Sequence, residues 1–231
     1  KFVNGGGWWD AAIKLHGKEM SYLNLFDTEA AWRLVHSMGE EPTVAVIKHA
    51  NPCGVSSHHD ITEAYIRANA CDPVSAFGGI VAVNKEVSGS MADELAKVFT
   101  EVVVAPSFTQ EAISKLTEKK NIRIIEAHPP GFPLLDMRSL DGGLLVQTCD
   151  RLQLDHSQWT IATDREPTES EWIDLDFAWR VAAKVSSNCI VLAKDKQALG
   201  IGAGQQNRRD AGVIAAEKAN GRAKGGVCAS D

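Results

Sequence analysis

The sequence lacks the features that mark disulfide-rich, zinc-scaffold and membrane-spanning proteins. Its five cysteines are odd in number, widely spaced and never form a Cys-x-x-Cys pair. This argues against a disulfide framework and a structural zinc site, and it indicates a reducing, cytoplasmic setting. No run of about 18 apolar residues is present to cross a bilayer. The stretch from Lys1 to Trp8 lacks the apolar core of a signal peptide and resembles a cut through something longer.

An excess of basic residues is also missing. The chain of 231 residues carries 24 Lys and Arg against 30 Asp and Glu, a net charge of -6 at pH 7. Broad nucleic-acid binding needs a strongly positive surface, so we expect no nucleic-acid partner. A hydrophobic content of 44% is ordinary for a globular protein, and the length suffices for one large or two small domains.

Short apolar stretches alternate with helical patterns along the first half. The expected strands cover residues 44–47, 80–83, 101–106 and 122–125. Before the first of these strands, Asp27 is expected to cap a helix that Gly39 ends. Between the strands, Asp60 opens a second helix, a third carries Met91, Leu95 and Val98, and Gln110 to Leu116 forms a fourth. This rhythm predicts an α/β protein whose mixed or largely parallel sheet is flanked by helices.

The rigid segment from His128 to Pro133 is the best candidate boundary. It predicts a first subdomain over residues 1–127 and a second over 128–231, which we expect to begin with Gly142 to Gln147. Thr168 is expected to start a helix, and the strands 189–192 and 199–202 to form a hairpin. No exact repeat is visible, but both halves contain a strand that runs into a polar or glycine-rich turn, which suits two related subdomains.

The strand Val44–Ile47 runs into Lys48 and His49, after which Pro52 and Gly54 are expected to turn the chain. Ligands of open α/β sheets gather beyond the carboxyl ends of strands. A lysine beside a histidine would offer there a fixed positive charge and a group that titrates near neutral pH. The alternative is that His49 only ends the strand while Lys48 is solvated.

A second candidate is Gly202-Ala-Gly204, which precedes a helix with Arg208 and Arg209 near its start. Exposed amides, the helix dipole and arginine together favour a bound phosphate, although a plain turn explains the glycines equally well. The glycine spacing differs from the dinucleotide fingerprint.

Three further polar residues have two interpretations each. Asn188 could orient a substrate amide or form a helix C-cap, and Glu101 could be a substrate ligand or an edge residue of its strand. Asp72 could be a catalyst or a turn former, and we interpret it as a turn former.

A zinc nucleobase deaminase is an alternative that His49 and Pro52-Cys53 suggest. That chemistry needs His-x-Glu and Pro-Cys-x-x-Cys. Asn51 and Ser56 occupy two of the required positions, so we expect no catalytic metal.

Several motifs occur together in a characteristic order. They are Lys48-His-Ala-Asn-Pro-Cys-Gly54, Cys71-Asp-Pro-Val-Ser-Ala-Phe-Gly-Gly79, Glu101-Val-Val-Val-Ala-Pro106, Gly142-Gly-Leu-Leu-Val-Gln147 and Gly200-Ile-Gly-Ala-Gly-Gln-Gln206. From about Leu15 to Asp231, the sequence resembles the AICAR transformylase domain of the bifunctional AICAR transformylase/IMP cyclohydrolase family.

The resemblance implies formyl transfer from 10-formyltetrahydrofolate to the 5-amino group of AICAR in purine biosynthesis. It also implies two cytidine-deaminase-like subdomains without the catalytic zinc, and a homodimer with active sites between protomers. The family's N-terminal cyclohydrolase domain, a nucleotide-binding segment before Lys1 and a folate-binding segment after Asp231 are expected to lie outside this sequence. We therefore expect weak AICAR binding and little turnover by this chain alone.

Position by position, the resemblance makes His49 the proton acceptor and Lys48 the stabiliser of the transition state. The nucleotide-contacting positions that it implies are Gly78, Glu101, Asn188, Arg208 and, from a looser match, Asn24; Arg209 falls where the folate approaches.

The chemistry agrees with these roles. The AICAR amine is a weak nucleophile that needs a base, and the attacked formyl group becomes an oxyanion that an ammonium stabilises. A nucleotide-binding remnant that dimerises without turnover is the alternative from another class.

Overall fold

The computed structural model describes residues 6–152 and 154–231, which form a helix-flanked α/β fold. Within these ranges nine strands make one sheet in the order β1-β6-β5-β4-β2-β3-β10-β9-β11, and β7 pairs with β8 in a separate hairpin. The strands are β1 (Ile13–His16), β2 (Thr43–Lys48), β3 (Asn51–Ser57), β4 (Gly79–Val83), β5 (Thr100–Ala105), β6 (Arg123–Glu126), β7 (Leu135–Leu140), β8 (Gly143–Thr148), β9 (Ile190–Lys194), β10 (Gln197–Gly202) and β11 (Val227–Ser230). The helices are α1 (Tyr22–Ser37), α2 (Ile61–Asn69), α3 (Pro73–Ala76), α4 (Gly89–Leu95), α5 (Gln110–Thr117), α6 (Glu169–Ala182) and α7 (Arg208–Ala219), with 3-10 turns η1 (Trp8–Asp10) and η2 (His156–Gln158).

The sheet is mixed rather than largely parallel. The ladders β4–β5 and β5–β6 are parallel, whereas β2 pairs antiparallel with both β3 and β4. Strands β2 and β3 must be antiparallel because only two residues connect them. The predicted hairpin in the second half is confirmed as β9 and β10.

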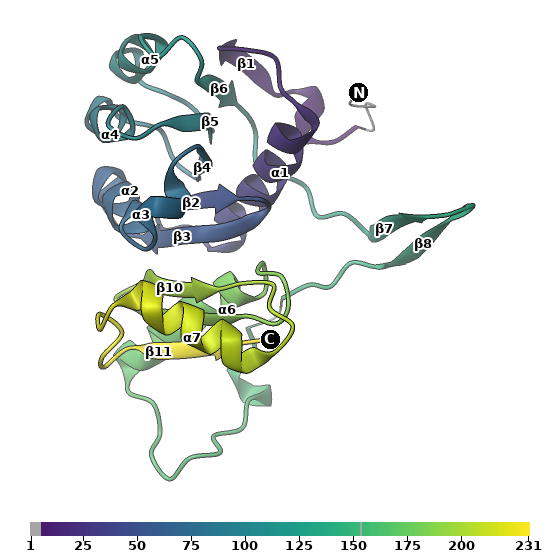
Figure 1. Ribbon diagram of the computed structural model, residues 1–231, viewed down its shortest axis with the longest axis vertical. Helices are drawn as coiled ribbons and strands as arrows, with labels where there is room; N and C mark the ends of the chain where they lie inside the picture. The colour runs from purple at the N-terminus through teal and green to yellow at the C-terminus, as the bar shows by residue number, and fades with distance from the viewer. Residues whose placement is uncertain (1–5, 153) are drawn as a thin grey trace.

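Helices cover both faces of the sheet (Figure 1). The core beneath α1 and α6 is one continuous cluster that includes Trp32, Val55, Phe177 and Val191. A second cluster lies beneath α2, α4 and α5. The two halves therefore share one sheet and one core, and the predicted division after residue 127 stays a prediction. No helix within residues 6–152 and 154–231 is long and apolar enough to cross a membrane.

The start of α1 differs from the prediction. Ser21, not Asp27, is the N-cap: its Oγ accepts from the Asn24 N–H at 3.1 Å, and the Asn24 Oδ1 accepts from the Ser21 N–H at 3.1 Å. This reciprocal arrangement is a capping box with asparagine in place of the usual Glu or Gln. Asp27 lies in the second turn of the helix, where its carboxylate is available to another element. The helix ends before Gly39 as predicted.

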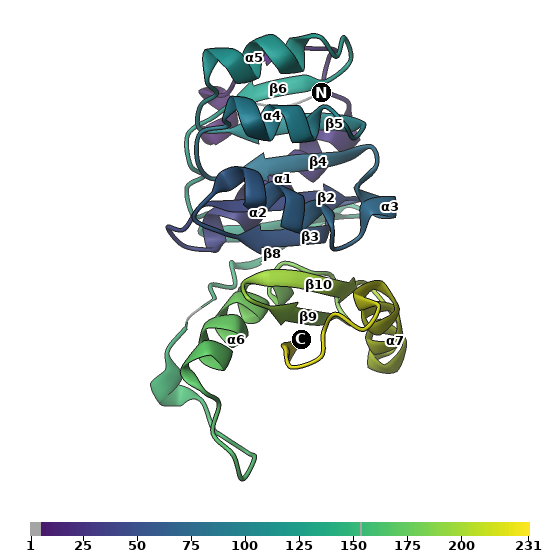
Figure 2. The same ribbon diagram turned by 90° about the vertical axis from the view of Figure 1, so that its left-hand side faces the viewer.

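The chain contains an internal repeat, which the sequence analysis expected only as two related subdomains and could not align residue by residue. Residues 21–84 and 168–231 share the order helix, hairpin, helix, strand, which is α1-β2-β3-α2 followed by β4 and α6-β9-β10-α7 followed by β11. The repeated helices carry Asp27-Thr-Glu-Ala-Ala-Trp-Arg33 and Asp174-Leu-Asp-Phe-Ala-Trp-Arg180. Figure 2 shows β10 beside β3 where the two repeats meet, and that pairing is antiparallel. An approximate two-fold axis therefore runs between β3 and β10, and equivalent turns point to opposite edges of the sheet.

Close contacts recur at equivalent positions of the repeat. A Cβ on Gly54 would lie 1.9 Å from the Ala68 carbonyl oxygen, and one on Gly200 would lie 2.0 Å from that of Ala215. Only glycine lets the second helix of each repeat approach its hairpin so closely. The repeat is therefore a property of the packing as well as of the element order.

The hairpin β7–β8 projects from the body of the molecule (Figure 1). Gly142 to Gln147 was expected to begin the second half, but it forms the return of this hairpin, and the second repeat begins at Thr168. Cross-strand pairing places exposed apolar side chains on one face, namely Leu135, Met137, Leu144 and Val146. The hairpin thus presents an apolar surface that no other described part of the chain covers.

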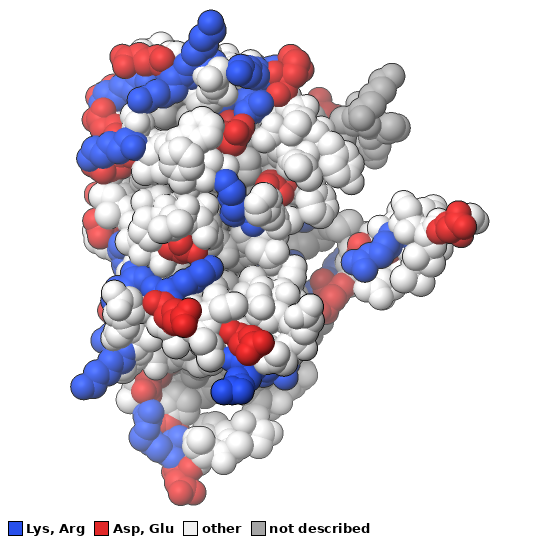
Figure 3. Space-filling view, viewed as in Figure 1, with Lys and Arg blue, Asp and Glu red and all other residues white. Residues whose placement is uncertain are grey.

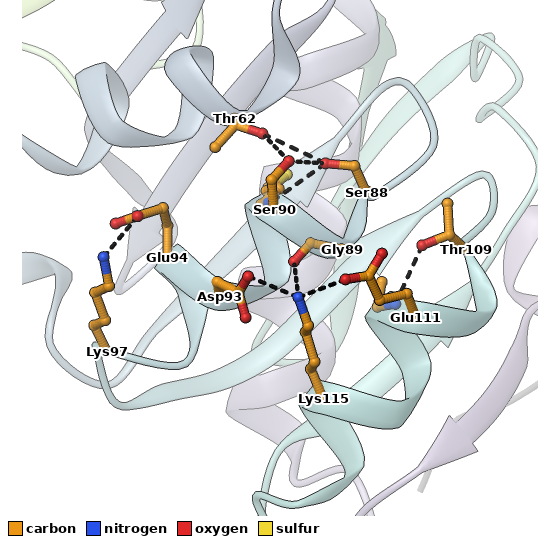
Figure 4. A network of polar contacts seen from close by, with 12 residues as sticks. Thr62, Ser88, Gly89, Ser90, Asp93, Glu94, Lys97, Thr109, Glu111 and Lys115 are labelled. Carbon is orange, nitrogen blue, oxygen red and sulfur yellow. Dashed lines mark hydrogen bonds and ion pairs between the residues drawn. The ribbon is translucent and has the colours of Figure 1, made fainter.

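A polar network fastens α4 to α5 on the outer helix layer (Figure 4). The Lys115 Nζ lies 2.6 Å from the Asp93 carboxylate and 2.7 Å from that of Glu111, and it donates to the Gly89 carbonyl at 3.2 Å. The hydrogen bond to Asp93, followed by that to Glu111, raises the pKa of Lys115. On the face shown in Figure 3, Lys and Arg are interspersed with Asp and Glu, so no continuous basic surface is formed there.

Candidate functional site

The predicted site residues from both repeats lie together along one edge of the sheet, by which we mean the row of strand ends where β2 and β10 finish. Strand β2 ends there at Lys48, next to the starts of β4 and β5, because Ile47 pairs with Ile80 and Gly79 with Thr100. Strand β10 also ends at this edge, since it runs antiparallel to β3. The predicted residues at or next to this edge are Asn24, Lys48, His49, Gly78, Glu101, Asn188, Arg208 and Arg209. The parallel strands β4, β5 and β6 present their amino ends here, so the expectation of a site at the carboxyl ends of strands fails for them and holds for β2, β10 and β11.

The chain turns at His49 and Ala50, not at Pro52 and Gly54. His49 has φ 52° and Ala50 φ 58°, the positive values that both central residues of a type I′ hairpin turn adopt. Pro52 and Gly54 lie within β3. Pro52 is tolerated because it lies opposite a register irregularity between Val46 and Ile47. Pro52 and Gly54, which have the strongest local preference for a turn, are therefore part of a strand.

Both repeats hold this turn in place. The Asp27 Oδ1 accepts from the Ala50 N–H at 2.9 Å, and the Asn51 Oδ1 accepts from the Ser186 N–H at 2.8 Å. Asn51 also donates through Nδ2 to the His49 carbonyl at 3.2 Å. The His49 residue is exposed. The turn backbone is thus fixed while the imidazole stays accessible to a ligand.

The Lys48 ammonium lies over the Phe77–Gly78 peptide. Its Nζ donates to the Phe77 carbonyl at 2.7 Å and to the Gly78 carbonyl at 3.1 Å. Gly78 has φ 70°, and a Cβ there would lie 3.1 Å from the Lys48 Nζ. An ammonium has three N–H groups, so the third can donate to a ligand. The prediction that Lys48 and Gly78 belong to one site is supported by this contact.

Glu101 is the second residue of β5, a strand that has neighbours on both sides in the sheet. Its carboxylate accepts from the Arg123 Nη1 at 2.5 Å, and Arg123 also donates to the Glu19 carbonyl at 3.0 Å. Arg123 is buried at 9% exposure. The sequence analysis missed Arg123, although an arginine at the start of an apolar strand is an available signal. The substrate role of Glu101 stays a prediction.

Asn188 joins two loops of the second repeat. Its backbone N–H and its Nδ2 both donate to the Gln205 carbonyl, at 3.0 and 3.1 Å. The Gln205 N–H returns a bond to the Asn188 carbonyl at 3.2 Å. The C-cap interpretation is wrong, because α6 ends at Ala182 with Ala183 as its C-cap. Its role towards a ligand stays a prediction.

Arg208 is the first residue of α7, and Asn207 is the N-cap. The Arg208 guanidinium donates from Nε to the Ser230 Oγ and from Nη2 to the Asp231 carbonyl, both at 2.7 Å. The N–H of Cys189 is the main reason that the pKa of Asp231 falls to about 2. Arg209 is exposed beside it. Two arginines therefore lie at a helix start, the geometry expected for an anion site.

The residues that suggested a zinc deaminase do not converge. The Cys53 Sγ is buried and donates to the Val46 carbonyl at 3.4 Å, whereas His49 is exposed on the turn. Burial is the main cause that raises the pKa of the Cys53 thiol to about 12. In the described ranges, no three His, Cys, Asp or Glu side chains are grouped to hold a metal ion.

Sequence comparison with known proteins assigns this chain to a family. The sequence model of the AICARFT/IMPCHase bienzyme matches residues 3–218. The chain belongs to the AICARFT/IMPCHase bienzyme family. Among similar proteins are the bifunctional purine biosynthesis proteins PurH of Bacillus cereus, at 49% identity over 95% of this chain, and of Nostoc punctiforme, at 47% over 96%. The chain spans 43% and 44% of their respective lengths, which is less than half.

Membership of the AICARFT/IMPCHase family confirms the resemblance drawn from the motifs. Sequence reasoning missed three residues that support the site, namely Asp27, Asn51 and Arg123. Asp27 was taken for a helix cap and Asn51 only for a departure from a zinc motif. Their roles depend on contacts between segments far apart in the chain, which local patterns do not contain.

Proposed function

We propose that this chain carries the formyl-transfer site for AICAR and acts in purine biosynthesis. The proposed reaction moves the formyl group of 10-formyltetrahydrofolate to the 5-amino group of AICAR. The observation that carries this proposal is the Lys48 ammonium held over the Phe77 and Gly78 carbonyls, directly beside the exposed His49. Family membership and the names of the relatives support it.

The proposed steps use both side chains. The AICAR nitrogen forms a bond to the formyl carbon, and the carbonyl electron pair moves to oxygen, where the third N–H of Lys48 stabilises the negative charge. His49 takes the proton that the amine loses. The carbon–nitrogen bond to the folate then breaks, and the released folate nitrogen gains a proton. The proposed reaction is balanced by proton transfer alone and assigns no role to a metal.

We propose a binding position for each substrate along this edge of the sheet. Arg208 and the start of α7 are proposed to receive the AICAR phosphate, because amides and a guanidinium suit an anion. Gly78, Glu101, Asn188 and Asn24 are proposed to line the nucleotide side, and Arg209 the approach of the folate.

A homodimer in the cytoplasm is part of the proposal. The exposed apolar face of the β7–β8 hairpin supports it, since an isolated two-stranded hairpin is at best marginally stable in water. A second copy of the chain would cover that face. Sedimentation measures this directly: Met137→Asp should shift the chain towards monomer, and an unchanged dimer would contradict the role of the hairpin.

Nucleotide binding without turnover is the second candidate. It is favoured by the composition of the edge, where most proposed contacts serve the nucleotide and Arg209 serves the folate. Calorimetry with AICAR, with and without a folate analogue, separates the two candidates when combined with a formyl-transfer assay. Ternary binding with transfer supports the enzyme. Binding of AICAR alone, without transfer, supports the second candidate.

A further inference from the structure

We infer that Asp27 is a positioning residue, which fixes the turn that presents His49 and Lys48. This inference rests on the proposed function for the role of His49, but the geometry concerns the turn itself. Asp27 lies on α1, whose Trp32, Leu34 and Val35 are fully buried in the core. Its Oδ1 accepts from the Ala50 N–H at 2.9 Å. A rigid helix thus holds the residue immediately after His49.

The turn needs such support because of its residue types. Positive φ at both central positions is ordinary for Gly, Asn or Asp, whereas here the residues are histidine and alanine. Alanine has no polar side chain to compensate for the left-handed conformation, so surrounding contacts must maintain it. The bond from Asp27 acts on that alanine.

The internal repeat supplies an independent second case. Asp174 occupies the position of Asp27 in the repeated helix motif. It accepts from the Asp195 N–H at 2.9 Å and the Lys196 N–H at 2.8 Å, and these two residues form the equivalent turn, with φ 52° and 53°. The helix aspartate is therefore a recurrent device for fixing this kind of turn. Helix capping does not explain Asp27, because Ser21 is the cap.

The test compares Asp27→Ala, Asp27→Asn and the double variant Asp27→Ala with Ala50→Gly. Asparagine keeps the acceptor oxygen, and glycine adopts positive φ without help. Asp60→Ala is the matched control, because Asp60 also accepts backbone N–H groups, at the start of α2, but lies at the opposite edge of the sheet. Amide hydrogen exchange of Ala50, measured on this chain, needs no turnover.

We expect Asp27→Ala to speed exchange of the Ala50 amide by about tenfold or more, with Asp27→Asn and Asp60→Ala within about threefold of the unaltered chain. In formyl transfer by a full-length protein that contains this chain, Asp27→Ala should lower kcat about 10–100-fold and change the KM for AICAR less than about threefold, because misplacing a reacting group costs rate. Ala50→Gly should restore most of that loss.

Two results would overturn the inference. One is unchanged exchange of the Ala50 amide in Asp27→Ala, which would show that the carboxylate does not hold the turn. The other is a loss of kcat that Ala50→Gly fails to restore, which would show that Asp27 acts by another route. Absence of formyl transfer by a full-length protein that contains the unaltered chain would instead contradict the proposed function, while the exchange measurement still decides whether Asp27 fixes the turn.

Discussion

The two hairpin turns of the repeat share one backbone design and differ in what their side chains do. Lys48-His-Ala-Asn51 joins β2 to β3, and Lys194-Asp-Lys-Gln197 joins β9 to β10. Each turn is held by an aspartate of the preceding helix. The lysine that starts each turn donates to the carbonyl of the residue just before a pair of glycines, which is Phe77 for Lys48 and Lys224 for Lys194. The glycine pairs are Gly78-Gly79 and Gly225-Gly226.

Polar groups of the second turn are bound to residues of the first repeat. The Lys196 ammonium pairs with the Glu41 carboxylate at 2.6 Å, Arg67 donates to the Asp195 carbonyl, and the Gln197 Nε2 donates to the Arg67 carbonyl at 2.8 Å. The first turn instead leaves His49 exposed. The comparison shows that one supersecondary unit can hold a structural joint at one edge of the sheet and a candidate reactive site at the other.

The largest effect on stability should come from Asp174→Ala. Asp174 is 8% exposed and accepts two turn N–H groups, whereas Asp27 accepts one. Unsatisfied donors cost about 1–3 kcal/mol each, so Asp174→Ala should lower the free energy of unfolding by about 2–6 kcal/mol and Asp27→Ala by about 1–3 kcal/mol. Urea unfolding of both variants measures this. Equal losses would show that the two turns are equally structural.

Arg208→Ala tests an arginine that is present in the second repeat and absent from the equivalent position of the first. The position equivalent to Arg208 in the first repeat is Ile61. If Arg208 contacts the phosphate, the substitution should weaken AICAR binding by about 1.5–3 kcal/mol and spare the ribonucleoside that lacks the phosphate. Calorimetry with both ligands provides the measurement. An equal loss for the two ligands would rule out phosphate recognition by Arg208.

His36 gives a smaller, pH-dependent difference between the repeats, since Ala183 is its equivalent. Burial, and next the charge of Lys85, lowers the pKa of His36 from 6.5 to about 4. In the unfolded chain His36 binds a proton near pH 6.5, whereas in the folded chain it does so only near pH 4. The free energy of unfolding therefore falls as the pH drops from about 6.5 to about 4.

His36→Leu should remove about 1 kcal/mol of the stability lost between pH 7 and pH 5, after allowance for partial exposure. Urea unfolding at both pH values is the measurement. Identical pH dependence in the two chains would contradict a buried neutral His36.

Much of the candidate site could be predicted because its signals are local. The strand that ends at Lys48 shows as an apolar run, the β9–β10 hairpin as two runs around polar residues, and Arg208 as a cation at a helix start. Motif order was enough to indicate the family. These features depend on neighbours in sequence, which is the information that patterns carry.

The errors arose where tertiary contacts override local preference. Gly54 was assigned to a turn, but the helix at Ala68 requires a residue without a Cβ in that strand. Asp27 matches a helix cap in sequence, yet it bonds to Ala50. The repeat is conserved between the halves mainly in a short Asp-to-Arg motif and in glycine positions, and it becomes evident when the sheet order is known.

The most direct test of the account is formyl transfer by His49→Ala beside Asp195→Ala, its equivalent in the repeat. Because little turnover is expected of this chain alone, both substitutions would be made in a full-length protein that contains this chain. That protein and both variants would be assayed at saturating AICAR and 10-formyltetrahydrofolate, with AICAR affinity measured separately. We expect His49→Ala to lower kcat by about 100-fold or more while the Kd for AICAR stays within about tenfold, because a general base acts mainly in the transition state. Asp195→Ala should keep kcat within about threefold. Turnover by His49→Ala within about tenfold of the unaltered protein would contradict the claim that this turn carries the catalytic base.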